Sequence, residues 1–131
     1  MIAGMGCDVV NMERLNKSLE FLERFGARIL GKDEQKELAD GKNIDKDKFR
    51  ASLAKRYSAK EAFVKALGTG FRNGIFLSDI QILHNREGKP FLKIGGETLR
   101  YMQKLYKEPI LHLSISDDYP VAMSMVIIEV K

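Results

Sequence analysis

The amino-acid sequence predicts an α+β fold, a single domain in which a mostly antiparallel sheet packs against one long helix. Residues 46–67 place apolar side chains at helical spacing over about six turns. Residues 110–116 alternate between apolar and polar side chains, which is typical of a strand with one buried face. Short turns at residues 85–90 and 117–120 join strand-like segments, which favours antiparallel pairing.

Hydrophobic periodicity and capping residues predict each element in turn. The first half of the chain is predicted to contain a strand at 2–10, a helix at roughly 12–24, a short helix that begins near 32–34, a polar loop at 41–47 and the long helix at about 46–67. Asn11 and Gly68 are suitable caps for the first helix and the long helix. The second half is predicted to contain strands at 79–84 and 91–94, a helix at about 96–107, and strands at 110–116 and 121–130.

Length and composition limit the class of protein. The 131 residues match one compact domain, so residues 1–131 are predicted to form a single unit. With 44% hydrophobic and 31% charged residues, the chain is expected to be globular. No apolar run approaches the roughly 20 residues of a membrane helix, the start lacks a signal-peptide pattern, and the single cysteine, Cys7, excludes an internal disulfide. A cytoplasmic protein without a membrane segment is therefore expected.

The net charge of +4 is distributed unevenly. Between Lys42 and Lys65, eight lysines and arginines stand against three acidic residues. Such an excess fits an anionic partner, such as phosphates, nucleic acid or an acidic protein, and it also fits a solvated helix face. Composition leaves both interpretations open.

The long predicted helix carries charges in an unusual position. At 100° per residue its apolar side chains form one broad arc, and Lys60 falls inside that arc. Glu61 and Lys65 are four residues apart and stand one turn apart on a neighbouring face, together with Ser58. A surface helix normally keeps its charges opposite the core, so this helix is predicted to hold ions at a half-buried edge.

Asp8 is a second acidic candidate for metal binding. In the predicted strand it shares a face with Gly4 and Gly6, which would leave room for a ligand beside its carboxylate. One aspartate and one glutamate are the minimal protein contribution to a Mg²⁺ site, which water and substrate phosphates usually complete. Asp8 and Glu61 are therefore a candidate magnesium pair. The alternatives are a helix cap for Asp8 and an exposed pair of Glu61 with Lys65.

Other polar residues are candidates for contacts to an anion or a partner. Lys65 could hold or protonate a phosphate, and the Gly68-Thr69-Gly70 segment could bring backbone N–H groups to an anion or simply end the helix. His112, Ser114 and Ser116 share one strand face and are candidates for hydrogen bonds to a ligand or to solvent. If the first helix continues far enough, a basic stripe forms a docking surface for an acidic partner or a solvated face; it contains Arg14, Lys17, Arg24 and Arg28.

Three separated segments resemble a known family. The first is Gly6-Cys7-Asp8-Val9-Val10 with Glu13-Arg14, the second is residues 57–70, and the third is His112-Leu113-Ser114-Ile115-Ser116. They resemble, in this order, the G-x-D-[IV]-V…E-R, [FW]-x-x-K-E-A-x-x-K-A-x-G-T-G and H-[VL]-S-[IL]-S segments of the bacterial holo-acyl-carrier-protein synthases, the small 4′-phosphopantetheinyl transferases. Cys7 and Asp117 depart from the residues usual at their positions.

The resemblance implies an activity and a set of catalytic residues. Enzymes of this family move phosphopantetheine from coenzyme A to a serine of acyl carrier protein, release adenosine 3′,5′-bisphosphate and support fatty acid biosynthesis. By this match, Asp8 and Glu61 would bind Mg²⁺ together with the pyrophosphate of coenzyme A. Glu61 would also accept the proton of the incoming serine, directly or through a metal-bound water, and Lys65 would stabilise the leaving phosphate.

The resemblance also implies contacts to both substrates and an oligomeric state. Coenzyme A would contact Arg56, Lys60, Gly68, Gly70, His112 and Ser114. The basic stripe of Arg14, Lys17, Arg24 and Arg28 would face the acidic carrier protein, where complementary charge aids encounter and register. The family implies a homotrimer with active sites at subunit interfaces.

Two other functions compete with the transferase. A basic module that binds nucleic acid would use residues 42–65, but the aromatic residues there, Phe49, Tyr57 and Phe63, lie on the apolar arc, and Asp8 and Glu61 would have no role. A Mg²⁺-dependent phosphohydrolase would use the same two carboxylates and would release phosphate without a carrier protein.

Overall fold

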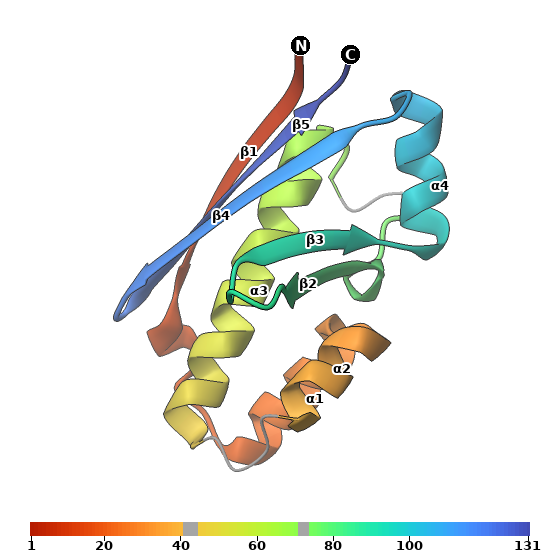
Figure 1. The fold of residues 1–131 in the computed structure, drawn as a ribbon. Helices are drawn as coiled ribbons and strands as arrows, with labels where there is room; N and C mark the ends of the chain where they lie inside the picture. The colour runs from red at the N-terminus through yellow and green to blue at the C-terminus, as the bar shows by residue number, and fades with distance from the viewer. Residues whose placement is uncertain (41–44, 71–73) are drawn as a thin grey trace.

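The computed structural model describes residues 1–40, 45–70 and 74–131 as an α+β fold with two antiparallel sheets (Figure 1). The described elements are β1 (Ile2–Asn11), the 3₁₀ helix η1 (Met12–Leu15), α1 (Leu19–Ile29), α2 (Lys32–Asp40), α3 (Lys46–Leu67), the 3₁₀ helix η2 (Leu77–Asp79), β2 (Ile80–His84), β3 (Pro90–Ile94), α4 (Gly96–Leu105), β4 (Ile110–Asp118) and β5 (Val121–Glu129). The fold class predicted from the sequence is confirmed. The strands form two sheets rather than one, because the β2–β3 hairpin pairs only with itself.

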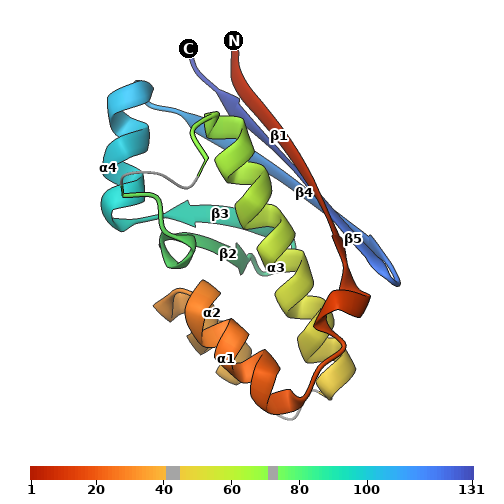
Figure 2. The same ribbon diagram turned by 180° about the vertical axis from the view of Figure 1, so that it is seen from behind.

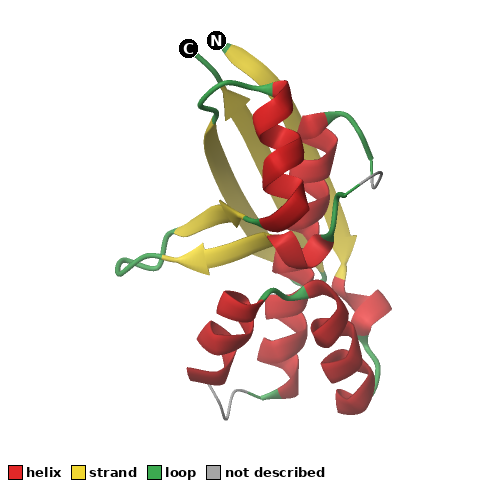
Figure 3. Ribbon diagram, turned by 90° about the vertical axis from the view of Figure 1, so that its right-hand side faces the viewer, coloured by secondary structure: helices red, strands yellow, loops and turns green. Residues whose placement is uncertain are grey.

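The larger sheet has the strand order β1-β5-β4, and α3 packs along its inner face (Figures 1 and 2). The two termini lie side by side, since β1 pairs with β5 and the amide of Val130 donates a hydrogen bond to the carbonyl of Met1. Seen from the side, α1 and α2 lie beyond the end of this sheet, beside the N-terminal half of α3 (Figure 3). The long helix therefore connects a sheet region with a small helical region.

Local capping explains where the helices begin and end. The carboxylate of Asp45 accepts the amide of Lys48 at the start of α3, and Gly68 adopts a left-handed conformation (φ 78°) at its end. The predicted bounds of the long helix are confirmed. Residues 41–44 of the predicted loop lie outside the described residues.

The prediction of one helix over residues 12–24 is wrong. Asn11 does cap the first turn, since its side chain accepts the amide of Glu13, but that turn ends at Leu15. Ser18 then caps a new helix by accepting the amide of Phe21 at 3.1 Å, and α1 continues to Ile29. A second good N-cap residue within the segment therefore breaks the predicted helix in two.

The hydrophobic core has two parts along α3. The first gathers around residues 62–67 and includes Phe63, Ile80, Val126 and Ile128. The second gathers around residues 53–54 and includes Leu22, Ile29 and Ala122. None of the helices in the described part of the chain is long and apolar enough to cross a bilayer. The turn of α3 between the two parts of the core carries the charged residues discussed below.

The glycines of β1 bring the strand onto α3. A Cβ atom at Gly6 would overlap the backbone of Ala62 and Ala66, and one at Gly4 would overlap the carbonyl of Ala66. The prediction that these glycines leave room for a ligand is therefore wrong, because the helix backbone fills that space. Their effect is to place Asp8, two residues further along β1, close to α3.

Candidate active site

A cleft of about 380 Å³ joins β1, η1, α1 and α3 at the edge of the sheet. Asp8 lines it from β1 and Glu61 lines it from α3, so the structure brings the two predicted metal ligands to one site. The other lining residues are Val9, Val10, Arg14, Leu15, Phe25 and Tyr57. Two carboxylates therefore share a solvent-accessible cleft with an arginine.

Lys65 lies beside Asp8. Its Nζ donates to Oδ1 of Asp8 at 3.0 Å and to the carbonyl of Cys7 at 3.1 Å. The hydrogen bond to Asp8 raises the pKa of Lys65, so its ammonium group is charged at neutral pH. The lysine side chain is 55% exposed and Asp8 is 15% exposed, so the cation can reach a ligand in the cleft without leaving its partner.

Tyr57 stands one turn before Glu61 on α3 and lines the same cleft. Burial, together with the hydrogen bond to Glu61 and the charges of Glu61 and Asp8, raises the pKa of Tyr57 to about 12. Its ring meets Phe25 of α1 edge-on, with 5.5 Å between ring centroids. Tyr57 therefore presents a protonated hydroxyl to the carboxylate cleft.

The chemistry of the donor set fits a magnesium ion. Among the described residues, no group of three or more His, Cys, Asp or Glu side chains forms a potential metal cage. Two carboxylates on a cleft open to solvent leave most coordination positions for water or phosphate, which is the arrangement that Mg²⁺ prefers. Asp8 and Glu61 are the residues that would hold such an ion.

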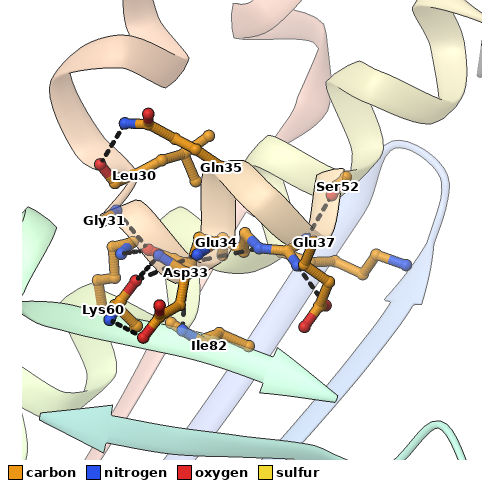
Figure 4. Close-up of polar contacts among 12 residues, drawn as sticks. Leu30, Gly31, Asp33, Glu34, Gln35, Glu37, Ser52, Lys60 and Ile82 are labelled. Carbon is orange, nitrogen blue, oxygen red and sulfur yellow. Dashed lines mark hydrogen bonds and ion pairs between the residues drawn. The ribbon is translucent and has the colours of Figure 1, made fainter. Parts of the chain in front are cut away.

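Lys60 lies in the interior, as the apolar arc indicated, and does not line the carboxylate cleft. It is completely buried, and its Nζ donates to Oε1 of Glu34 at 2.6 Å (Figure 4). The same Nζ also donates to the carbonyls of Leu77 and Ile80. Burial lowers the pKa of Lys60 to about 8 although Glu34 acts in the opposite direction, so the ammonium form predominates at pH 7. With its three donors occupied inside the protein, Lys60 cannot make the predicted contact to coenzyme A.

Arg56 belongs to the same buried cluster. Its Nε lies 3.4 Å from Oε2 of Glu34, and its two terminal nitrogens donate to Glu37 at 2.9 Å and Ser52 at 2.5 Å. Only 6% of its side chain is exposed. The predicted contact of Arg56 to coenzyme A is therefore not supported by its placement. Arg50 is also buried, so three of the basic residues between 42 and 65 do not form a surface patch for nucleic acid.

His112 and Ser114 lie on the other face of the sheet from the carboxylate cleft. They alternate along β4 with Leu111 and Leu113, which pack toward α3. The Nε2 atom of His112 lies 2.8 Å from Oε1 of Glu129 on β5. Within one chain the sheet separates these two residues from Glu61.

The Gly68-Thr69-Gly70 segment ends the helix. The amide of Gly68 donates to the carbonyls of Val64 and Lys65, so it is not available to a phosphate. Gly70 also has a left-handed conformation (φ 66°) and precedes residues 71–73, which lie outside the described residues. The predicted anion contact of Gly68 is therefore wrong for its amide, and that of Gly70 stays a prediction.

The four residues of the predicted basic stripe are all exposed but do not share one helix. Arg14 belongs to η1 and lines the carboxylate cleft. Lys17 lies in the turn before α1, and Arg24 and Arg28 lie on α1. Arg28 also lines a second cavity of about 360 Å³ together with Phe25, Tyr57 and residues 75–78. Phe25 and Tyr57 border both cavities, so the two cavities are adjacent and are together called the recess below; Arg14 lines one of them and Arg28 the other.

The comparisons with known proteins identify a family for the chain. The family model of the 4′-phosphopantetheinyl transferase superfamily matches residues 4–124. The chain belongs to this superfamily. It is 41% identical to the holo-[acyl-carrier-protein] synthase of Erythrobacter litoralis, with 98% of this chain and 97% of the relative covered.

Solved structures of holo-acyl-carrier-protein synthases share the fold. The enzyme from Neisseria meningitidis is 34% identical with a TM-score of 0.81, and 98% of this chain and 99% of that chain are covered. The enzyme from Bacillus anthracis, solved in complex with coenzyme A (3′,5′-ADP), is 31% identical with a TM-score of 0.79, and 100% of this chain and 99% of that chain are covered.

Sequence reasoning missed three features of the site in this phosphopantetheinyl transferase. Tyr57 was assigned to the apolar arc, although its spacing of four residues from Glu61 could have indicated a hydroxyl beside the carboxylate. Phe25, which borders both cavities, gave no signal, because the predicted helix ends at residue 24 whereas α1 continues to Ile29. Glu34 gave none either, because its partners Lys60 and Ile82 are distant in the chain.

Proposed function

We propose that this chain transfers 4′-phosphopantetheine from coenzyme A to a serine of apo acyl carrier protein and releases adenosine 3′,5′-bisphosphate. The observation that carries the proposal is the cleft lined by Asp8 and Glu61, with the charged Lys65 bonded to Asp8, in a chain of the phosphopantetheinyl transferase superfamily. The relatives are named holo-[acyl-carrier-protein] synthases, and one was solved with coenzyme A. The proposed product supports fatty acid biosynthesis in the cytoplasm.

The transfer step needs one proton acceptor and stabilisation of negative charge. The serine Oγ bonds to the phosphorus atom next to pantetheine as the bond from that phosphorus to the bridging oxygen breaks, and adenosine 3′,5′-bisphosphate leaves. Glu61 accepts the serine proton. When bound by Asp8 and Glu61, Mg²⁺ would offset charge on the pyrophosphate. Positioning and electrostatics dominate phosphoryl-type transfer, so few residues suffice.

Lys65 acts on the leaving group as a cation. Because Asp8 raises the pKa of Lys65, the side chain keeps its proton and is poorly suited to donate it. Its exposed ammonium group is within reach of a phosphate in the cleft while it still contacts Asp8. Electrostatic stabilisation is therefore favoured over proton donation.

A homotrimer with active sites between subunits would explain two features of the sheet. Its outer face exposes large apolar side chains, including Met5 and Val9 on β1 and Met123 and Met125 on β5. Contiguous exposed apolar surface is typical of a subunit interface. His112 and Ser114 lie on this outer face, so a neighbouring copy is the way they could contact the same coenzyme A as Glu61. This arrangement retains the proposed coenzyme A contacts of both residues.

The carrier protein is proposed to dock around α1. Arg14 and Arg28 line the recess beside Glu61, Arg24 lines a smaller pocket next to Arg28 and Phe25, and Lys17 lies in the turn before α1. Exposed cations around a recess complement an acidic partner and accelerate encounter. The serine of the carrier would thereby reach the carboxylate cleft.

Intact-protein mass spectrometry tests the proposal. Apo acyl carrier protein is incubated with this protein, coenzyme A and Mg²⁺, in parallel with a chelator control and a known transferase as positive control. A mass gain of one phosphopantetheine that disappears with chelator is expected. Release of phosphate without modified carrier would instead support a Mg²⁺-dependent phosphohydrolase that uses the same carboxylates.

A further inference from the structure

Glu34 is the centre of a buried charge cluster composed of Glu34, Arg56 and Lys60. Its side chain is completely buried, yet four groups approach its two oxygens. Oε1 accepts the amide of Gly31 at 2.9 Å and the ammonium of Lys60 at 2.6 Å. Oε2 accepts the amide of Ile82 at 3.1 Å and faces Nε of Arg56 at 3.4 Å. One carboxylate thus joins the start of α2, the strand β2 and the helix α3 (Figure 4).

Lys60 extends this connection to the segment before β2. Its ammonium group also donates to the carbonyls of Leu77 and Ile80, at the two ends of η2. An ammonium has three donors, and all three have partners here. The segment 75–78, which forms one wall of the 360 Å³ cavity, is therefore held by the residue directly before Glu61.

The charge cluster is attached to the junction between α1 and α2. Gly31 packs so closely against Ser78 and Gln81 that a Cβ atom would overlap both. The side-chain oxygen of Gln81 accepts the amides of Asp33 and Glu34 and so caps the start of α2 from another element. The charge cluster therefore fixes the end of α1 from which Arg28 and Phe25 reach the recess.

We propose that Glu34, Arg56 and Lys60 are positioning residues that hold α1, and with it the carrier-binding residues Arg24 and Arg28, in place relative to Glu61. The inference rests on the proposed function and adds that these buried residues control how well the carrier protein binds. A buried charge cluster that served stability alone could be replaced by apolar side chains at little cost. This cluster instead contacts the junction between α1 and α2 and the segment 75–78 that forms a wall of the cavity, and it includes the residue directly before Glu61.

The inference predicts a specific kinetic effect. Removing the cluster lets α1 shift relative to α3, and small displacements of a docking surface cost activity by misplacing the reacting group. Asp8, Glu61 and Lys65 lie outside the cluster, so binding of coenzyme A should be unchanged. The affected quantity is the KM for the carrier protein.

The test compares two charge-conserving double variants. Glu34→Gln with Lys60→Met removes the buried pair, while Glu97→Gln with Arg100→Met removes the exposed pair of α4, whose atoms lie 2.6 Å apart, with the same change in charge. The first variant is expected to raise the KM for carrier protein about tenfold with less than a twofold change in the KM for coenzyme A. The second is expected to change neither.

Hydrogen exchange separates positioning from general unfolding. In the Glu34→Gln, Lys60→Met variant, the amides of Gly31 and Ile82 should lose protection while the amides of β5 keep theirs. Lost protection with an unchanged KM for carrier protein would overturn the inference. If this variant does not fold, Gln81→Ala, which uncaps α2 without touching the buried charges, should raise the same KM by a smaller factor, and an unchanged KM there would also overturn it. An inactive wild-type protein would instead overturn the proposed function itself.

Discussion

Two groups of charges, each built around residues of α3, differ in their exposure to solvent, and this difference decides their roles. At the sheet edge, Asp8, Glu61 and Lys65 line or adjoin an open cleft, and Lys65 is more than half exposed. In the interior, Glu34 and Lys60 are completely buried and form their hydrogen bonds with other groups of the protein. The residue types are the same, and the adjacent residues Lys60 and Glu61 belong to different groups. Successive residues on a helix point 100° apart, so one short motif provides both a buried anchor and a reactive edge.

The comparison shows how a charge becomes available for chemistry. A buried charge must be matched by partners to offset its desolvation, and matched partners leave no donor for a ligand. The exposed carboxylates and ammonium group are hydrated instead, and a ligand can replace that water. Substitutions in the two groups should therefore have opposite signatures: loss of turnover at the edge and loss of stability in the interior.

The largest expected effect is on turnover, from Glu61→Gln. This variant keeps the shape of the side chain but removes the negative charge that would hold Mg²⁺ and accept the serine proton. We expect kcat to fall about 1000-fold with little change in thermal stability, because Glu61 is outside the buried cluster. Carrier modification followed by mass spectrometry measures this effect, with Glu97→Gln on the surface of α4 as the control. Activity within tenfold of wild type would contradict the assigned role.

The interior counterpart is Glu34→Gln alone. It removes one partner of a buried ion pair and leaves Lys60 and Arg56 without a full counter-charge, which should lower the free energy of unfolding by about 3 kcal/mol. Urea denaturation followed by circular dichroism measures this loss. Glu61→Gln, measured in parallel, should lie within about 0.5 kcal/mol of wild type. Equal losses in the two variants would remove the distinction between edge and interior.

The sequence predicted those parts of the fold that depend on neighbours in the chain. The bounds of α3 follow from Asp45 and Gly68, which cap it through local hydrogen bonds. The burial of Lys60 followed from helical periodicity. The break between η1 and α1 was missed because Asn11 and Ser18 are both good caps, and periodicity alone does not show that both are used.

The sequence could not predict contacts that depend on distant segments. The partner of Lys60 is Glu34, which is 26 residues away in the chain, so the sequence predicts a ligand contact where the structure has a buried ion pair. The space beside Gly4 and Gly6 was taken for a ligand site, whereas α3 fills it. Asp8 and Glu61 do line one cleft, as predicted. That prediction used the ligand chemistry of a Mg²⁺ site and the motif resemblance, which supply the long-range information that periodicity lacks.

Lys65→Ala tests the role of the cation at the sheet edge. Loss of the cation beside the leaving phosphate should lower kcat about tenfold to 100-fold, whereas Lys65→Arg should restore most of the rate because it retains the charge. Single-turnover measurement of carrier modification at saturating coenzyme A isolates this step. If Lys65→Ala has the wild-type rate, the lysine serves only as a partner for Asp8.

The smallest expected effect concerns Arg28, which is exposed on α1 beside the recess. A single exposed charge contributes little to binding, but it acts on encounter with an acidic partner. Arg28→Glu should therefore raise the KM for carrier protein several-fold, leave the KM for coenzyme A unchanged, and lose most of its effect when the ionic strength is raised, since salt screens exposed charges. Arg100→Glu on α4 makes the same change in net charge away from the recess and should have no such effect. If both variants raise the KM equally, the net charge of the protein rather than the position of Arg28 on α1 determines carrier binding. The functional residues at the sheet edge would then be Asp8, Glu61 and Lys65 without Arg28.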